Sequence, residues 1–278
     1  MNHIIKLNLA RNCIKYIIKA YGIKEIFIPY YTCNTVWQAI REENCNIKFY
    51  HIDKNFMPTR DFEQNSYILY TNYFGLCFEN CQKLTEKYKN IIIDNAHGFY
   101  SPHLGLASFN SLRKFFKVQN GAFLYLNKKL TGEIPNDQLH LTPILMQENY
   151  EKFLKNELIL NKEKDIKLLS KNVSKTMENI DFETDKQIRL SRYQKYTMLF
   201  SKYNTIQLTA NGNNIPYCYP FNTTNSEILQ KFIDNEFILL RLWQNIPKSF
   251  IEHNILNNTI ALPLNHTPTF DNIIKTFS

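Results

Sequence analysis

Short apolar runs alternate with helical patterns in the first half of the chain, and this alternation limits the fold more than any other feature. Short apolar runs predict strands, and the amphipathic stretches between them predict helices. The expected strands are Glu25–Ile28, Ile47–Ile52, Tyr67–Thr71, Ile91–Ile93, Leu106–Phe109 and Ala122–Leu126, and the expected helices are Asn12–Tyr21, Cys33–Glu43 and Asn80–Tyr88. This order indicates an α/β fold with a largely parallel sheet and helices on both faces.

The second half has a different pattern, which predicts a smaller α+β domain. We expect one long amphipathic helix over Glu148–Met177, with Tyr150, Phe153, Leu154 and Leu158 along one side. The elements expected after it are a helix over Lys186–Tyr203, a strand over Ile215–Phe221, a helix over Ser226–Phe232, a strand over Phe237–Leu240 and a terminal helix from Phe270. A boundary near Lys129–Leu141 gives domains 1–135 and 136–278.

Composition narrows the possible partners. The 278 residues are 44% hydrophobic, which is enough for a sizeable core. The net charge of +8 comes from lysines interspersed with acidic residues, which indicates solvated helix faces rather than a nucleic-acid interface. Such a positive field would favour an anionic substrate. No apolar stretch is long enough to span a membrane, and Lys6 and Arg11 interrupt any signal peptide.

The six cysteines form no Cys-x-x-Cys pair, a pattern typical of a reducing cytoplasm. Cys77 and Cys81 stand one helical turn apart and could hold a metal only if two more ligands converged. No histidine lies near them in the sequence. We therefore expect buried free thiols and no metal.

The sharpest local signal is the run Ile91–His97, which reads Ile-Ile-Ile-Asp-Asn-Ala-His. Three consecutive isoleucines are typical of a buried parallel strand. Asp94 follows directly, so it lies at the carboxyl edge of the sheet, where ligands of open α/β sheets bind. The alternative is that Asp94 only caps a helix or a loop through backbone amides.

A second signal is the basic cluster around Lys114, which stands between a short strand and a pair of phenylalanines. A lysine against apolar surface favours its neutral, nucleophilic form. The alternative is that Lys114 and Lys117 are exposed while Phe115 and Phe116 join the core. Gly121 then begins the next apolar strand.

Taken in order, these segments resemble the DegT/StrS-type sugar aminotransferases, which are pyridoxal-phosphate (PLP) enzymes of fold type I (aspartate-aminotransferase-like). The resemblance rests on Asp-x-Ala-His at Asp94–His97, Ser-Phe at Ser108, and a lysine seven positions before a glycine, which selects Lys114 rather than Lys117. Further similar segments are 8–14 (Asn-Leu-Ala-Arg-Asn-Cys-Ile), 28–32 (Ile-Pro-Tyr-Tyr-Thr), 49–53, 70–75 and 261–266 (Ala-Leu-Pro-Leu-Asn-His).

The resemblance implies a role for each matching residue. Lys114 would form the Schiff base with PLP and then move the proton, and Asp94 would hold the protonated ring nitrogen. His97 would lie against the cofactor or reach its phenolic oxygen. Ser108 would bind the phosphate, together with the backbone amides of Arg11 and Asn12 at a helix start. The family places an aromatic residue where this chain has Cys33, and its lysine stands five positions after the serine rather than six.

The resemblance also implies the reaction and the partners. We expect amino transfer from glutamate to a keto-sugar or a similar small carbonyl compound in surface polysaccharide biosynthesis, by a cytoplasmic homodimer. The alternative is a catalytically degenerate homologue that acts as a binding or scaffold protein. A nicotinamide enzyme and a Ser-His-Asp hydrolase are disfavoured, because neither Gly-x-Gly-x-x-Gly nor Gly-x-Ser-x-Gly occurs. A sugar dehydratase of the same fold would have replaced Lys114.

Overall fold

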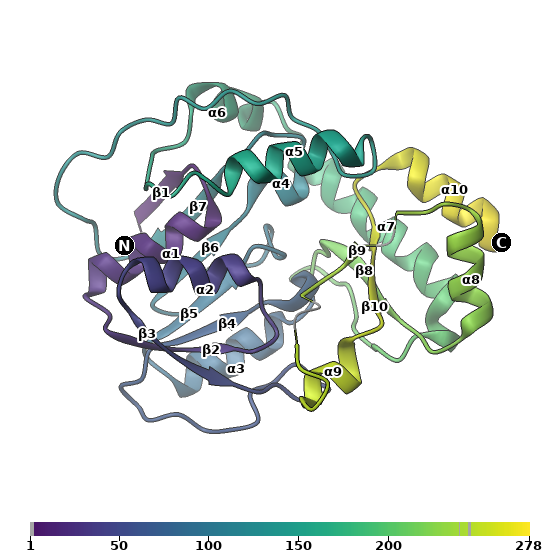
Figure 1. Cartoon of the computed structure of the whole chain (residues 1–278), viewed down its shortest axis with the longest axis horizontal. Coiled ribbons are helices and arrows are strands. Elements are labelled where there is room, and N and C mark those ends of the chain that lie inside the picture. Colours follow the sequence, from purple (N-terminus) through teal and green to yellow (C-terminus); the bar gives the residue numbers. More distant parts are fainter. Residues whose placement is uncertain (1–2, 239, 244–245) are drawn as a thin grey trace.

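The central feature of this computed structural model, which describes residues 3–238, 240–243 and 246–278, is a seven-stranded sheet of order β1–β7–β6–β5–β4–β2–β3 (Figure 1). Its strands are β1 (His3–Leu7), β2 (Glu25–Pro29), β3 (Asn46–Tyr50), β4 (Ile68–Thr71), β5 (Ile91–Asn95), β6 (Ala107–Asn110) and β7 (Ala122–Leu126). Strands β2 to β6 are parallel; at one edge β7 pairs antiparallel with β6, and β1 pairs antiparallel with β7. The mostly parallel sheet expected from the sequence is therefore confirmed.

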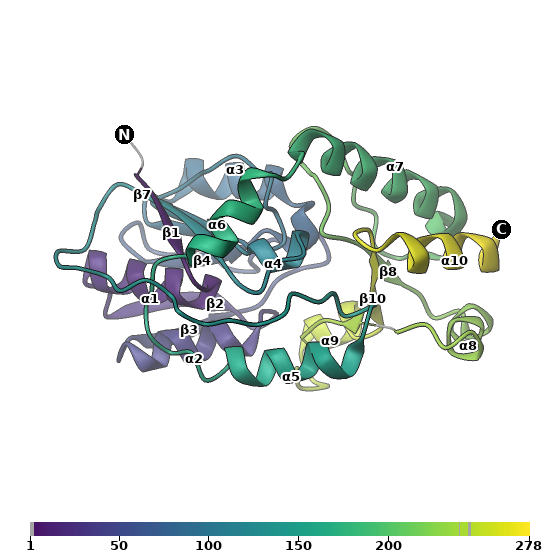
Figure 2. The ribbon, with the colours of Figure 1, turned by 90° about the horizontal axis from the view of Figure 1, so that it is seen from above.

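Helices cover both faces of this sheet (Figure 2). The helices α1 (Ala10–Tyr21) and α2 (Asn34–Glu42) pack on one face and α3 (Phe78–Lys87) on the other. In β5 the side chains alternate accordingly, since Ile92 joins the core under α1 and α2 while Ile91 and Ile93 join the core under α3. Asp94 is in phase with Ile92, so its carboxylate points to the side where α1 begins.

The C-terminal half forms a second, antiparallel sheet of order β8–β10–β9, with helices around it (green and yellow in Figure 1). Its elements are α7 (Phe182–Phe200), β8 (Cys218–Asn222), α8 (Ser226–Asp234), β9 (Leu240–Arg241), α9 (Ile251–Leu256), β10 (Thr259–Pro263) and α10 (Thr267–Phe277). The chain also contains the 3-10 turns η1 (Tyr73–Gly75), in its first half, and η2 (Ser201–Tyr203), directly after α7. This is the α+β content expected, and the domain boundary at residue 135 stays a prediction.

The prediction of a single helix over Glu148–Met177 is wrong. The chain instead forms α5 (Tyr150–Leu160) and α6 (Lys171–Glu178), separated by irregular backbone. Each helix has its own N-cap, because the Asn149 side chain accepts a hydrogen bond from Lys152 N and the Ser170 side chain accepts one from Val173 N. Caps of this kind compete with helix continuation even where the apolar spacing suits a helix.

Several element boundaries also differ from the sequence prediction. The strand expected over Phe237–Leu240 is β9, at Leu240–Arg241, and Leu239 lies outside the described residues. The strands β1 and β10 had not been expected. The helix α10 begins at Thr267, ahead of Phe270, because the His266 side chain caps it and a proline occupies its first turn.

Candidate active site

A cavity of about 120 Å³ lies at the carboxyl ends of the parallel strands. Its walls are the last residues of β4 and β5, the first turn of α1, the start of α2 and the one-turn helix α4 (Leu112–Phe115). The residues that line it include Arg11, Asp94, His97 and Lys114. Four of the six predicted site residues therefore meet around one cavity, at the sheet edge where open α/β proteins bind ligands.

Asp94 is almost completely buried, with 6% of its surface exposed. Its Oδ1 accepts a hydrogen bond from Ala96 N at 2.8 Å, which fixes the turn after β5. Burial raises the pKa of this carboxyl above its usual range, and the nearby Lys114 ammonium opposes that rise. Asp94 therefore does cap a backbone amide, as the alternative held, but it also faces the cavity with a carboxylate that a cation would stabilise.

His97 is buried, yet neither ring nitrogen has a hydrogen-bond partner among the described residues. Its ring stacks with Tyr217, at a centroid distance of 4.6 Å, and with Trp243, at 5.2 Å and nearly parallel. Burial lowers the pKa of His97 well below its usual range, with a further contribution from Lys114. A buried imidazole without a partner is rare, because the cost of desolvation is not offset, so a ligand group is the natural partner.

Lys114 lies on α4, with its ammonium 5.7 Å from the centre of the Tyr217 ring. Burial lowers its pKa, while Cys33 and Asp94 raise it. The neutral amine is therefore more accessible here than on an ordinary surface lysine. Lys117, by contrast, lies on the surface, where it binds Glu148 at 2.7 Å, so it is Lys114 and not Lys117 that borders the cavity.

The turn from β1 into α1 forms one end of the cavity, which Leu9, Ala10 and Arg11 line. The first amides of a helix have no intrahelical acceptors, so a helix start of this kind can bind an anion. The Arg11 guanidinium donates to Asn161 Oδ1 at 2.9 Å, and burial lowers its pKa. The Asn12 side chain does not line the cavity, since it is buried and donates to Asn8 Oδ1 and Asp165 O.

Ser108 does not line the cavity, and its side chain lies on the other side of the sheet. In β6, Ala107 and Phe109 join the core under α1, so Ser108, between them, points to the opposite face. Its hydroxyl lies 3.4 Å from His103 Nδ1. The serine that lines the cavity is Ser111, three residues before Lys114, and sequence reasoning missed it. The spacing of six residues between Ser108 and Lys114, where the family has five, was the feature of the sequence that could have pointed to another serine.

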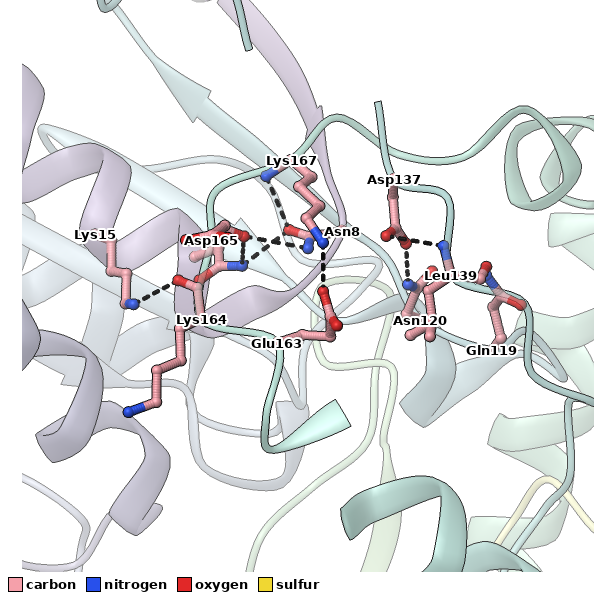
Figure 3. A network of polar contacts seen from close by, with 11 residues as sticks. Asn8, Lys15, Gln119, Asn120, Asp137, Leu139, Glu163, Lys164, Asp165 and Lys167 are labelled. Carbon is pink, nitrogen blue, oxygen red and sulfur yellow. Dashed lines mark hydrogen bonds and ion pairs between the residues drawn. The ribbon is translucent and has the colours of Figure 1, made fainter. Parts of the chain in front are cut away.

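A network of polar contacts holds the turn before α1 in place (Figure 3). Asn8 pairs with Lys167 through its backbone and side chain, and Lys15 donates to Lys164 O at 2.6 Å. The backbone oxygen of Asn8 also accepts from Gly121 N at 2.6 Å. Gly121 has a left-handed φ of 114°, and a Cβ there would come within 2.7 Å of Leu112. The glycine thus brings the loop after Lys114 against the α1 turn.

The same network extends to the long loop that follows β7. Asn120 donates to Asp137 Oδ2 at 2.6 Å, and the Gln119 side chain donates to Leu139 O at 2.5 Å (Figure 3). Polar side chains at 119 and 120 therefore anchor the loop over residues 137–139. This chain thus has its own means of fixing the segment that follows Lys114.

A second cavity of about 310 Å³ adjoins the first. The residues common to both linings are Cys33, Arg113, Lys114, Glu157 and Trp243. Apolar side chains such as Met146, Phe153 and Leu242 form much of the outer wall. Lys114 therefore stands at the junction of an inner cavity near Asp94 and an outer cavity that opens toward the C-terminal half.

The buried Arg189 on α7 supports this region from behind. Its guanidinium binds Asp185 at 2.6 Å and donates to Phe115 O at 2.8 Å, and it reaches the carbonyl oxygens of Pro216 and Tyr217 at 3.3 and 3.4 Å. One side chain thus connects α4, which carries Lys114, to the segment that carries Tyr217. No local sequence pattern indicated that Arg189 would support this region.

Other kinds of site have little support in the described part of the chain. No group of three or more metal-ligating side chains occurs there. Cys77 and Cys81 are buried free thiols, as expected. None of the helices combines the length and the apolar character that crossing a bilayer requires.

Known structures share this architecture over nearly the whole chain. An aminotransferase of the DegT/DnrJ/EryC1/StrS type from Brucella abortus is 13% identical, with a TM-score of 0.63, over 99% of this chain and 85% of its own. PseC from Helicobacter pylori, an aminotransferase of pseudoaminic acid biosynthesis, is 16% identical, with a TM-score of 0.63, over 99% and 86%. DesV from S. venezuelae is 12% identical, with a TM-score of 0.65, over 99% and 83%.

This chain has the fold of the DegT/StrS-type sugar aminotransferases. The sequence by itself gives no such match, since no protein-family profile and no curated protein matches it. The resemblance read from ordered short motifs is therefore confirmed at the level of the fold. At this identity the likeness does not assign roles to residues, so the site rests on the geometry described above.

Proposed function

We propose that this chain is a PLP-dependent aminotransferase that transfers an amino group from glutamate to a keto-sugar, or a similar small carbonyl compound, in surface polysaccharide biosynthesis. The observation that carries the proposal is the meeting of Lys114, Asp94 and His97 around one cavity that begins at a helix N-terminus. An amine, a buried carboxylate and an anion-binding turn are the three groups that a phosphorylated, cationic pyridine aldehyde requires.

The residues around the inner cavity fit this cofactor. Both nitrogens of the buried His97 lack partners, so a ring substituent of the cofactor could satisfy one of them. Asp94 is a buried carboxylate whose ionised form calls for a cation, which a protonated ring nitrogen supplies. Ser111 and the first turn of α1 would hold the phosphate. When bound, the cofactor supplies an electron sink for the carbanion formed in amino transfer.

The chain's own groups would then divide the remaining work. Lys114 would hold the cofactor covalently and could then move a proton at the reacting carbon, a role that its lowered pKa favours. The negative charge of Asp94 would keep the ring nitrogen protonated. Tyr217 and Trp243 stack with His97, and the apolar wall of the outer cavity would keep water from the reacting atoms.

Neighbouring structures support the cofactor and the substrate class. Spr1654 from Streptococcus pneumoniae, which shares the fold with TM-scores of 0.65 to 0.68, is known in apo, PLP and PMP forms. PseC is an aminotransferase involved in the biosynthesis of pseudoaminic acid. A glutamate donor and a polysaccharide pathway are our extension to this chain.

We further propose that the protein is a homodimer. The helix α5 exposes four large apolar side chains, Tyr150, Leu154, Leu158 and Ile159, with Leu158 65% exposed. An exposed apolar row on one helix favours a protein interface. The free cysteines support a reducing compartment, and we propose the cytoplasm.

Borohydride reduction of the PLP-loaded protein, followed by peptide mass mapping, tests the central proposal. We expect a single covalent adduct on Lys114. An adduct on Lys117 would overturn the assignment of the lysine. The absence of any adduct, with a folded protein, would favour the scaffold alternative. Sedimentation at micromolar concentration tests the dimer, and Leu158→Lys should shift it to monomer.

A further inference from the structure

A bidentate ion pair stands at the junction of the two cavities. Arg113, next to Lys114 on α4, binds both carboxylate oxygens of Glu157 on α5, and the Nη2–Oε2 distance is 2.8 Å. The two side chains are 20% and 25% exposed. Both line the inner and the outer cavity. The pair therefore borders the space in which a substrate would approach Lys114.

The position of Glu157 does not suit a purely structural role. The helix α5 buries only Leu160, so it adds little to the core. Fastening α5 to the molecule through Arg113 leaves two charged groups facing a cavity, and partly desolvated pairs of this kind add little net stability. A neighbouring contact, from Arg11 to Asn161 at the end of α5, involves a neutral amide.

Among the described residues, Arg113 has no carboxylate partner other than Glu157. Lys114 interacts with Asp94, and Arg11 binds Asn161. Burial lowers the pKa of Arg11, and the nearby Arg113 guanidinium lowers it further, because the two cations repel each other. An anion at Arg113 relieves this repulsion, and Glu157 supplies it in the present structure.

We propose that Arg113 is the binding site for a carboxylate of the amino donor, and that Glu157 occupies this site until the donor arrives. The inference rests on the proposed aminotransferase function. Glu157 presents the same chemical group as the side chain of a dicarboxylic amino acid, bound in the bidentate geometry that arginine favours.

The exchange of one carboxylate for another conserves charge at Arg113. No covalent bond forms or breaks, and Glu157 moves into the solvent that it already partly contacts. An internal competitor of this kind lowers the apparent affinity, because only the fraction of molecules in which Glu157 has left the site can bind the ligand. Removing Glu157 should therefore tighten binding of a carboxylate ligand, whereas removing Arg113 should weaken it.

Calorimetric titration with glutarate, a dicarboxylate without an amino group, tests the proposal on the cofactor-free and the PLP-loaded protein. We expect Glu157→Gln to tighten glutarate binding about tenfold and Arg113→Gln to weaken it at least about tenfold, as for loss of a charge-assisted bidentate contact. The matched control is Glu151→Gln, which makes the same change at an exposed residue of α5 that pairs with Lys155. It should leave glutarate binding unchanged.

Weaker or equal glutarate binding by Glu157→Gln would overturn the proposal, and so would unchanged binding by Arg113→Gln. If Arg113→Gln does not fold, Arg113→Lys can replace it in the test, because it keeps the positive charge. Its affinity for glutarate should still fall several-fold, because lysine lacks the two parallel donors of the guanidinium. The neutral glutaramide should bind every variant equally weakly. Binding to the cofactor-free protein does not depend on Lys114 chemistry, so failure of the proposed function would be seen separately, in the peptide map.

Discussion

Replacing Asp94 by asparagine separates the electrostatic role of the carboxylate from its role in the turn. Asp94 Oδ1 accepts from Ala96 N, and an asparagine oxygen can accept the same bond, so the backbone after β5 should keep its shape. What changes is the charge that the proposal places opposite the ring nitrogen of the cofactor. The proposed attachment of PLP requires the Lys114 amine and not Asp94, so the variant should still become coloured with PLP.

The size of the effect follows from the burial of the pair. An opposite charge within a few ångströms shifts a pKa by about 1–3 units, and each unit corresponds to about 1.36 kcal/mol. Asp94 is only 6% exposed, so solvent screens this interaction little. Losing the carboxylate should therefore raise the barrier to carbanion formation by about 1.4–4 kcal/mol, which slows amino transfer about 10- to 1,000-fold.

The assay is a single-turnover half-reaction with glutamate, followed by the visible absorbance of the bound cofactor. Asp61→Asn provides the matched control, because it makes the same change at an exposed residue that pairs with Lys87. The control should convert at the wild-type rate. If Asp94→Asn also converts within about twofold of wild type, Asp94 serves only the turn and the reasoning fails.

Three further results are expected. In the cofactor-free protein, burial raises the folded-state pKa of Asp94, so the folded protein loses stability as pH rises through that pKa. Near pH 8, Asp94→Asn should therefore melt at a higher temperature than wild type. Below about pH 4, where Asp94 is protonated in the folded and the unfolded state, the two melting temperatures should converge. A lower melting temperature for the variant near pH 8 would mean that the turn outweighs the charge. Ser111→Ala should weaken PLP binding about tenfold in an absorbance titration, and Ser108→Ala should leave it within about twofold; the reverse order would restore Ser108 as the phosphate ligand. Arg189→Met should lower the free energy of unfolding in urea by about 3–5 kcal/mol, because it leaves several buried acceptors without a donor, and a loss under about 1 kcal/mol would show that water replaces the guanidinium.

The sequence predicts the part of the fold where local and tertiary preferences agree. Three consecutive isoleucines at 91–93 suit only a strand buried on both faces, and the structure has β5 there. The position of Asp94 follows from the strand, because any residue just after it lies at the carboxyl edge. The sequence selects Lys114 by its distance from Gly121, and in the structure the backbone of that glycine joins α4 to the turn before α1.

Other features depend on contacts between segments far apart in the chain. The irregular segment before α6 lies against the turn at Asn8, where Asp165 and Lys167 form hydrogen bonds with Asn8. These residues are more than 150 positions apart, so apolar spacing cannot predict the contact. Ser108 was misplaced because an alternating strand decides which face each side chain takes, and the motif carried no information about the face. Trp243 and Glu157 meet Lys114 and its neighbour Arg113 only through tertiary folding, so no local pattern could have selected them.

The hydrogen bonds of Arg189 have a mechanical consequence. The helix α7 belongs to the C-terminal half, while Phe115 lies on α4 beside Lys114. A hinge motion that turned the C-terminal half away from the sheet would either break the bond to Phe115 or carry α4 with it. In the second case Lys114, the proposed attachment point of the cofactor, would travel with the moving body rather than with the strands, and the motion would displace this lysine from Asp94.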